Sequence, residues 1–193
     1  MKKKKKAFFI ISVVVTLFAA SCSQPAAPKP RGYFRIDFPE KSYEKFESDC
    51  GFTFDIPVYA TLKPSKVSTA RKCWYDITFP GYNATIYFTY NPLKDDLDVH
   101  VEDIRKIAYK HIIKANDIIE DPFYFPDKNV SGIIYRITGN TASSMNFFLT
   151  DSSTGFVSGS LYFDVSPNQD SLAPAIDFFQ QDMLHLVNSF EWE

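Results

Sequence analysis

The N-terminal sequence of this chain indicates the cellular compartment in which the rest of it must fold. Five consecutive lysines, Lys2 to Lys6, precede 14 mostly apolar residues at positions 7–20, and Ser21 and Cys22 follow. This order is typical of a lipoprotein export signal, with a basic start, a short apolar stretch and small residues before a cysteine. A membrane-spanning helix needs a longer apolar stretch, of about 20 residues. We therefore expect residues 1–21 to be a signal peptide and Cys22 to carry acyl chains such as palmitate, which anchor the mature chain to a membrane.

Two further cysteines, Cys50 and Cys73, remain in the exported chain. An oxidising compartment favours disulfides, so we predict that these two residues are bonded. The alternative is a pair of buried free thiols. A metal site is disfavoured, because neither cysteine has CxxC spacing or a histidine nearby in the sequence.

The mature chain has the length and charge of one acidic domain. Residues 22–193 carry 16 basic and 23 acidic side chains, a net charge of −7, which disfavours a nucleic-acid partner. Residues 22–31 contain Pro25, Pro28 and Pro30 and no apolar periodicity, which indicates an extended tether. We expect residues 32–193 to form a single α+β domain, because this length suits one hydrophobic core.

The hydrophobic pattern after residue 50 favours strands, with two helical segments. Phe52, Phe54 and Ile56 alternate with polar residues, as in a strand with one buried face. The pattern predicts a hairpin of 73–79 with 83–90, a helix over 99–112, strands at 118–125, 130–139, 142–150 and 155–165, and a helix over 171–190 with Pro174 in its first turn. This order predicts an α+β fold, in which helices flank a mostly antiparallel sheet.

No residue pattern indicates an enzyme. His100 and His111 lie on one predicted helix, roughly 16 Å apart, and His185 lies beside the apolar stripe of the last helix. The chain has no HExxH, GxSxG, phosphate-binding glycine loop or dinucleotide motif. A cluster of acidic residues could in principle hold calcium: Asp95, Asp96, Asp98, Glu102 and Asp103. Their position at the start of the predicted helix explains them better, because the helix dipole favours acidic residues there. We expect no catalytic residues, no cofactor and no metal.

Residues 32–46, called the strap below, are too aromatic for a free linker. We expect an ordered segment that lies on the domain. Tyr33, Tyr43 and the flanking arginines Arg31 and Arg35 have the composition of a protein interface, so we predict that these four residues bind a partner. Lys41 and Lys45 are expected to be rim charges of little weight. The alternative is that the aromatic residues only cover one edge of the sheet.

The segment PKPRGYFRIDFPEKSY, residues 28–43, resembles the gliding motility lipoprotein GldD family of the Bacteroidota. The resemblance extends to CGFTFDIP at 50–57, to Cys73 and Trp74, and to SFEW at 189–192. It implies a component required for gliding and for the associated type IX secretion machinery, which assembles or stabilises other envelope lipoproteins and membrane proteins. It implies no catalytic activity. The order of elements is also similar to the PsbP/Mog1-like α-β-α sandwich, an analogy that does not fix function.

Two further expectations concern the mature chain in the cell envelope. No aspartate directly follows Cys22, which favours the outer membrane over the inner membrane. No acidic cluster follows it either, which favours the periplasmic face of that membrane over the cell surface. Asp170, Ser171 and Leu172 match the D-(S/T)-apolar pattern of Bacteroidota O-glycosylation, so Ser171 is a candidate glycan site. The alternative is that Ser171 only caps the last helix.

The main function that we expect is that of a lipid-anchored, non-catalytic scaffold. Tyrosine and phenylalanine are more frequent than a core of this size requires, since aromatic residues make up 17% of the chain. This excess suggests an alternative function, a periplasmic binding module for a small apolar ligand or a glycan. A cleft of several hundred cubic ångströms, lined by aromatic and a few polar groups, would favour this alternative.

Overall fold

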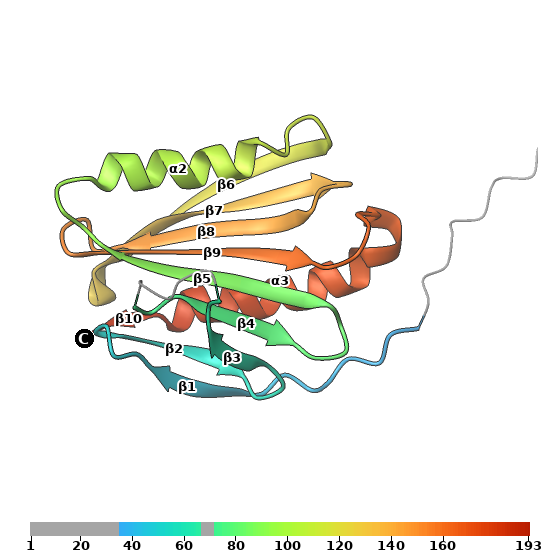
Figure 1. Cartoon of the computed structure of the whole chain (residues 1–193), viewed down its shortest axis with the longest axis horizontal. Helices are drawn as coiled ribbons and strands as arrows, with labels where there is room; N and C mark the ends of the chain where they lie inside the picture. The colour runs from blue at the N-terminus through green and yellow to red at the C-terminus, as the bar shows by residue number, and fades with distance from the viewer. Residues whose placement is uncertain (1–34, 67–71) are drawn as a thin grey trace, which may run out of the picture. The chain divides into compact units, whose positions relative to one another are not determined.

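Alternating apolar residues form ten β-strands in the described part of the chain, and two helices pack with them (Figure 1). The computed structural model describes residues 35–66 and 72–193. Within these ranges the strands are β1 (Tyr43–Glu47), β2 (Phe52–Pro57), β3 (Thr61–Pro64), β4 (Tyr75–Phe79), β5 (Ala84–Pro92), β6 (Ala115–Phe125), β7 (Val130–Gly139), β8 (Ser143–Thr150), β9 (Gly155–Phe163) and β10 (Glu191–Trp192). The helices are α2 (Leu97–Tyr109) and α3 (Gln169–Ser189), and a short 3₁₀ helix, Pro126–Lys128, follows β6.

The described strands form two sheets in which every pair is antiparallel. The larger sheet has seven strands in the order β3-β4-β5-β9-β8-β7-β6, and the smaller sheet has the order β1-β2-β10. The centre of the larger sheet joins β5 to β9, which are far apart in the sequence, with Phe88 opposite Gly159. Figure 1 shows this strand order from β6 to β4.

The two faces of the larger sheet are covered differently. On one face, Phe147 and Leu149 of β8 belong to the larger core cluster, which also contains residues of α3 and β2. On the other face, Phe148 and Phe156 pack with α2 in a smaller cluster. Successive strand residues point to opposite faces, so a run of buried residues in β8 supplies both clusters. The predicted α+β class, a mostly antiparallel sheet flanked by helices, is confirmed.

Four elements depart from the predicted pattern. The strap ends in a strand, β1, which pairs with β2, and the short strands β3 and β10 were not expected. These are edge strands in which polar side chains point outward, so their apolar alternation is weak. Helix α3 begins at Gln169, so Pro174 lies beyond its first turn. Its N-cap is Asn168, which accepts a hydrogen bond from the Ser171 N–H, and the capping role considered for Ser171 is therefore wrong.

The predicted disulfide between Cys50 and Cys73 is confirmed. Their Cα atoms lie 6.3 Å apart, and 23 positions separate the two residues in the sequence. Cys50 lies just before β2 of the smaller sheet, and Cys73 lies just before β4 of the larger sheet. The Ser48 hydroxyl donates to Sγ of Cys73 over 3.4 Å, in a buried position. The disulfide therefore ties the two sheets together at one end.

Removing the disulfide should lower the free energy of unfolding without changing the fold. We expect the Cys50→Ala, Cys73→Ala double variant to lose about 3 kcal/mol, because the unfolded chain regains the entropy of an open loop. Urea denaturation of the variant and of the unaltered protein, monitored by tryptophan fluorescence, measures the difference in the free energy of unfolding. An unchanged midpoint would show that the bond adds nothing to stability.

Candidate functional site

A buried carboxylate, Asp182 of α3, holds the strap against the domain. Its side chain is fully buried and accepts three hydrogen bonds from residues far away in the sequence. Lys41 Nζ lies 2.6 Å from Oδ1, and the hydroxyl of Tyr43 lies 2.9 Å from the same atom. The Tyr59 hydroxyl lies 2.8 Å from both carboxylate oxygens. We call these four residues the Asp182 cluster.

The surroundings of the Asp182 cluster shift the pKa values of its members. Burial raises the pKa of the Tyr43 and Tyr59 hydroxyls, and their hydrogen bonds to Asp182 raise it further. Both tyrosines therefore remain donors to the carboxylate. Burial lowers the pKa of Lys41, and its bond to Asp182 opposes this shift. The ammonium group also lies 3.3 Å above the ring centre of Phe178, a cation–π contact.

Aromatic side chains of the strap pack inside the molecule. Phe38 stacks on Phe178 of α3, with ring centres 4.3 Å apart, and on Tyr82, whose hydroxyl donates to the Asp37 carbonyl. Tyr43 stacks on His185 at 3.6 Å. The apolar part of the strap thus packs within the molecule, against α3 and the turn before β5, whereas the alternative interpretation expected it to cover an edge of the sheet.

The four predicted partner-binding residues are placed differently. Arg31 and Tyr33 lie outside the described residues. Arg35 is 89% exposed, and its guanidinium pairs with the equally open Asp37 at 2.9 Å. Tyr43 is half-buried and uses its hydroxyl on Asp182. The expectation that Lys41 is a rim charge is wrong, because its ammonium group reaches the buried carboxylate; Lys45 is exposed.

Sequence reasoning missed Asp182 and Tyr59. A usable signal existed for Asp182, since it lies three residues after Phe179 and directly before Met183, on the apolar stripe of α3. A charged residue at a stripe position is buried, and a buried charge requires partners. Tyr59 follows β2 in a turn, where no periodicity applies, so nothing in the sequence distinguished it.

The histidines and the acid cluster engage in local contacts. His100 stacks on Phe156 and lies 3.5 Å from Asp96, whose pKa is lowered chiefly by the Lys94 backbone N–H. His185 Nε2 lies 3.0 Å from Asp55. In residues 35–66 and 72–193 no three His, Cys, Asp or Glu side chains are grouped closely enough to hold a metal ion.

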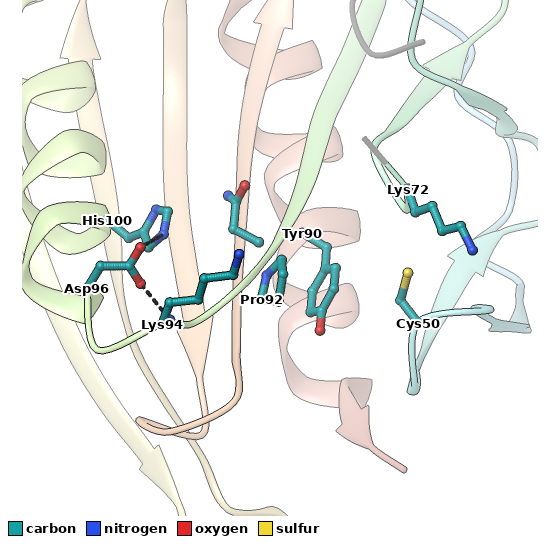
Figure 2. A pocket seen from close by; sticks show the side chains of 8 residues that line it. Cys50, Lys72, Tyr90, Pro92, Lys94, Asp96 and His100 are labelled. Carbon is teal, nitrogen blue, oxygen red and sulfur yellow. Dashed lines mark hydrogen bonds and ion pairs between the residues drawn. The ribbon is translucent and has the colours of Figure 1, made fainter. Parts of the chain in front are cut away.

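A cleft lies on the α2 side of the larger sheet. It measures about 880 Å³, with a floor of β5 and β9 side chains and a wall of α2 side chains from His100 to Lys110. A second cleft of about 500 Å³ shares Asn91 and His100 with it and extends past Pro92 to Lys72 and Cys50 (Figure 2). The two clefts therefore adjoin, and together they are called the groove below.

A scan against protein families matches residues 23–192 to the gliding motility lipoprotein GldD. The chain belongs to the gliding motility lipoprotein GldD family. Membership carries a role in gliding motility and a lipoprotein's attachment to an envelope membrane. No helix among the described residues is long and apolar enough to cross a membrane. A search of curated proteins found no match.

Among the solved structures that this GldD-family chain matches, one comes from a cyanobacterium. It is the solution structure of cyanobacterial PsbP (CyanoP) from Synechocystis sp. PCC 6803, at 10% sequence identity and a TM-score of 0.47. The match covers 83% of this chain and 98% of that one. A likeness at this level carries no argument about function.

Replacing Asp182 should destabilise the domain strongly. We expect Asp182→Ala to lower the free energy of unfolding by about 3 kcal/mol, because it leaves two tyrosine hydroxyls without their acceptor and the Lys41 charge with only the Phe178 carbonyl. Asp177→Ala, an exposed position on the same helix, is the matched control and should change stability little. Thermal and urea unfolding of both variants measure the difference. Equal stability of the two would contradict the role assigned to the cluster.

Proposed function

We propose that this GldD-family chain is a lipid-anchored, non-catalytic assembly component of the gliding apparatus and of the associated type IX secretion machinery. It acts through protein–protein contacts with other envelope lipoproteins and membrane proteins. The acyl chains on Cys22 hold it at the periplasmic face of the outer membrane, and residues 22–31 form the tether. Family membership supports the motility role, and the strap supports the mode of action.

The observation that carries this proposal is the division of the strap into an inner and an outer side. Phe38, Lys41 and Tyr43 are bound to α3, which fixes the backbone of the segment. Arg35 is left 89% exposed, with a single, equally exposed ion-pair partner. A fixed backbone that presents an exposed guanidinium loses little entropy when a partner binds, which is the property of an interfacial anchor residue.

The chemistry of the described residues supports a non-catalytic role. The ring of His100 is stacked on Phe156, and the ring of His185 is stacked on Tyr43 and paired with Asp55. Burial lowers the pKa of His111, and its Nε2 is buried without a hydrogen-bond partner. A histidine that activates a nucleophile is hydrogen-bonded to it, whereas among the described residues the rings of His100 and His185 pair with Asp96 and Asp55.

Ser171 remains a candidate glycan site. It is exposed in the first turn of α3, and its backbone N–H, not its hydroxyl, binds Asn168. The hydroxyl is therefore free of the cap. An intact-protein mass that changes only by the lost oxygen in Ser171→Ala would exclude the modification.

Removing the two strap arginines should impair motility and leave the domain folded. We expect an Arg31→Ala, Arg35→Ala double variant to weaken a central contact by about 2 kcal/mol, the scale of an interfacial arginine. The measurement is gliding and secretion of the variant strain, together with the protein's steady-state level and melting temperature. Lys45→Ala is the control, since an exposed charge contributes little.

Two results would contradict the interface. Normal gliding of the double variant at normal abundance would show that the arginines bind no required partner. Lost gliding with collapsed abundance or a lowered melting temperature would assign the arginines to the stability of the domain.

Replacing Cys22 by alanine should leave unprocessed precursor and abolish acylation, because no other residue supplies the thiol to which the lipid is attached. Metabolic labelling with a fatty-acid analogue, followed by capture of the protein, measures this. Ser21→Ala keeps a small residue before the cysteine and is expected to be labelled normally. Label retained on Cys22→Ala would refute the anchor.

A further inference from the structure

The α2 face of the larger sheet is only partly covered. Helix α2 packs over β8 and β9, where Phe148 and Phe156 lie beneath it. The neighbouring strand β5 continues the same face, and its Tyr87 remains 47% exposed. The result is the larger cleft of the groove, with sheet side chains as its floor. This floor is formed by one regular face of two paired strands, so its side chains stand in fixed rows.

The floor of the groove consists of hydroxyl and aromatic side chains. Thr89 and Ser158 are opposite each other, and their hydroxyls lie 2.7 Å apart. Tyr87 and Tyr162 pack edge to face, with ring centres 5.7 Å apart. Among the described residues, the hydroxyls of Tyr87, Ser160 and Tyr162 have no hydrogen-bond partner, so they are available to a ligand.

The adjoining end of the groove is basic. Lys72 and Lys94 both line it, and neither ammonium group forms an ion pair within residues 35–66 and 72–193. The acid present there, Asp96, is already engaged by the Lys94 backbone N–H and by His100, as the dashed lines in Figure 2 show. Two unpaired lysines thus make this end of the groove locally basic on a chain whose mature net charge is −7.

We propose that this groove binds an acidic oligosaccharide of the uronate type. The C–H faces of its sugar rings stack on Tyr87 and Tyr162, as apolar faces do on aromatic rings. Its hydroxyls exchange hydrogen bonds with Ser160 and with the free tyrosine hydroxyls, and carboxylates of different sugar units pair with Lys94 and with Lys72. This activity goes beyond the assembly role and does not depend on it.

Other ligand classes fit the groove less well. A purely apolar ligand would displace water from the hydroxyl groups of the floor and give them no hydrogen-bond partner, which costs free energy. An extended peptide that adds to a sheet needs a free strand edge, whereas β5 and β9 are paired with each other. Recognition here must therefore use side chains, and the polar groups that they offer match a sugar's hydroxyls.

The test is calorimetric titration of the complete acylated protein in detergent with three probes. These are alginate oligosaccharides, neutral laminari-oligosaccharides of the same length, and oligoglutamate, which separates an acidic sugar from an acidic peptide. We expect saturable binding of the alginate probe, weaker binding of the neutral one and none of oligoglutamate. The variants are Tyr87→Ala and Lys94→Ala, and Tyr124→Ala on β6, which is 63% exposed and outside the groove, is the control.

Each variant has a distinct expected effect. Tyr87→Ala should weaken binding of the alginate probe by about tenfold, since it removes one stacking ring. Lys94→Ala should reduce the preference for the acidic over the neutral sugar, since Lys72 remains, and Tyr124→Ala should bind as the unaltered protein does. Melting temperatures confirm that all three variants are folded. Absent binding of the alginate probe, equal binding of oligoglutamate, or unchanged affinity in folded Tyr87→Ala would each overturn the proposal.

Discussion

One buried carboxylate, Asp182, joins three parts of the fold that are remote in sequence. This side chain of α3 accepts hydrogen bonds from Lys41 and Tyr43 of the strap and from Tyr59 in the turn after β2. A buried charge without partners costs several kcal/mol, so this site is stable only while all three donors are present. The position of β1, and with it the smaller sheet's outer edge, therefore depends on a helix more than 130 residues further along the chain.

This dependence separates the molecule into two sides with different properties. On the α3 side, aromatic residues of the strap, β2 and α3 fill a continuous core, while polar residues of the strap, Arg35 among them, remain exposed. On the α2 side, a shorter helix covers only part of the sheet and leaves the groove. The proposed partner contact and the proposed sugar site thus use different surfaces, and each can be altered without the other.

The sequence predicts those elements whose side chains alternate or recur with a clear period. The hairpin of β4 and β5 turns at Pro80 to Tyr82 as expected, because proline and glycine terminate both strands. The short edge strands β1, β3 and β10 were missed, since their partners and not their own patterns fix them. The Asp182 cluster and the groove were missed because both bring together residues that only the tertiary fold places side by side.

The most direct test of this account is amide hydrogen exchange in the complete chain and in its Asp182→Asn variant, which keeps the side chain's size but removes its charge. If the Asp182 cluster holds the strap, amides of β1, Tyr43–Glu47, should exchange at least tenfold faster in the variant, since their protection derives from local docking. Amides of β7 and β8 should accelerate less than those of β1, because their exchange follows only the variant's loss of global stability. Unchanged exchange in β1, or an equal increase throughout the chain, would contradict the account.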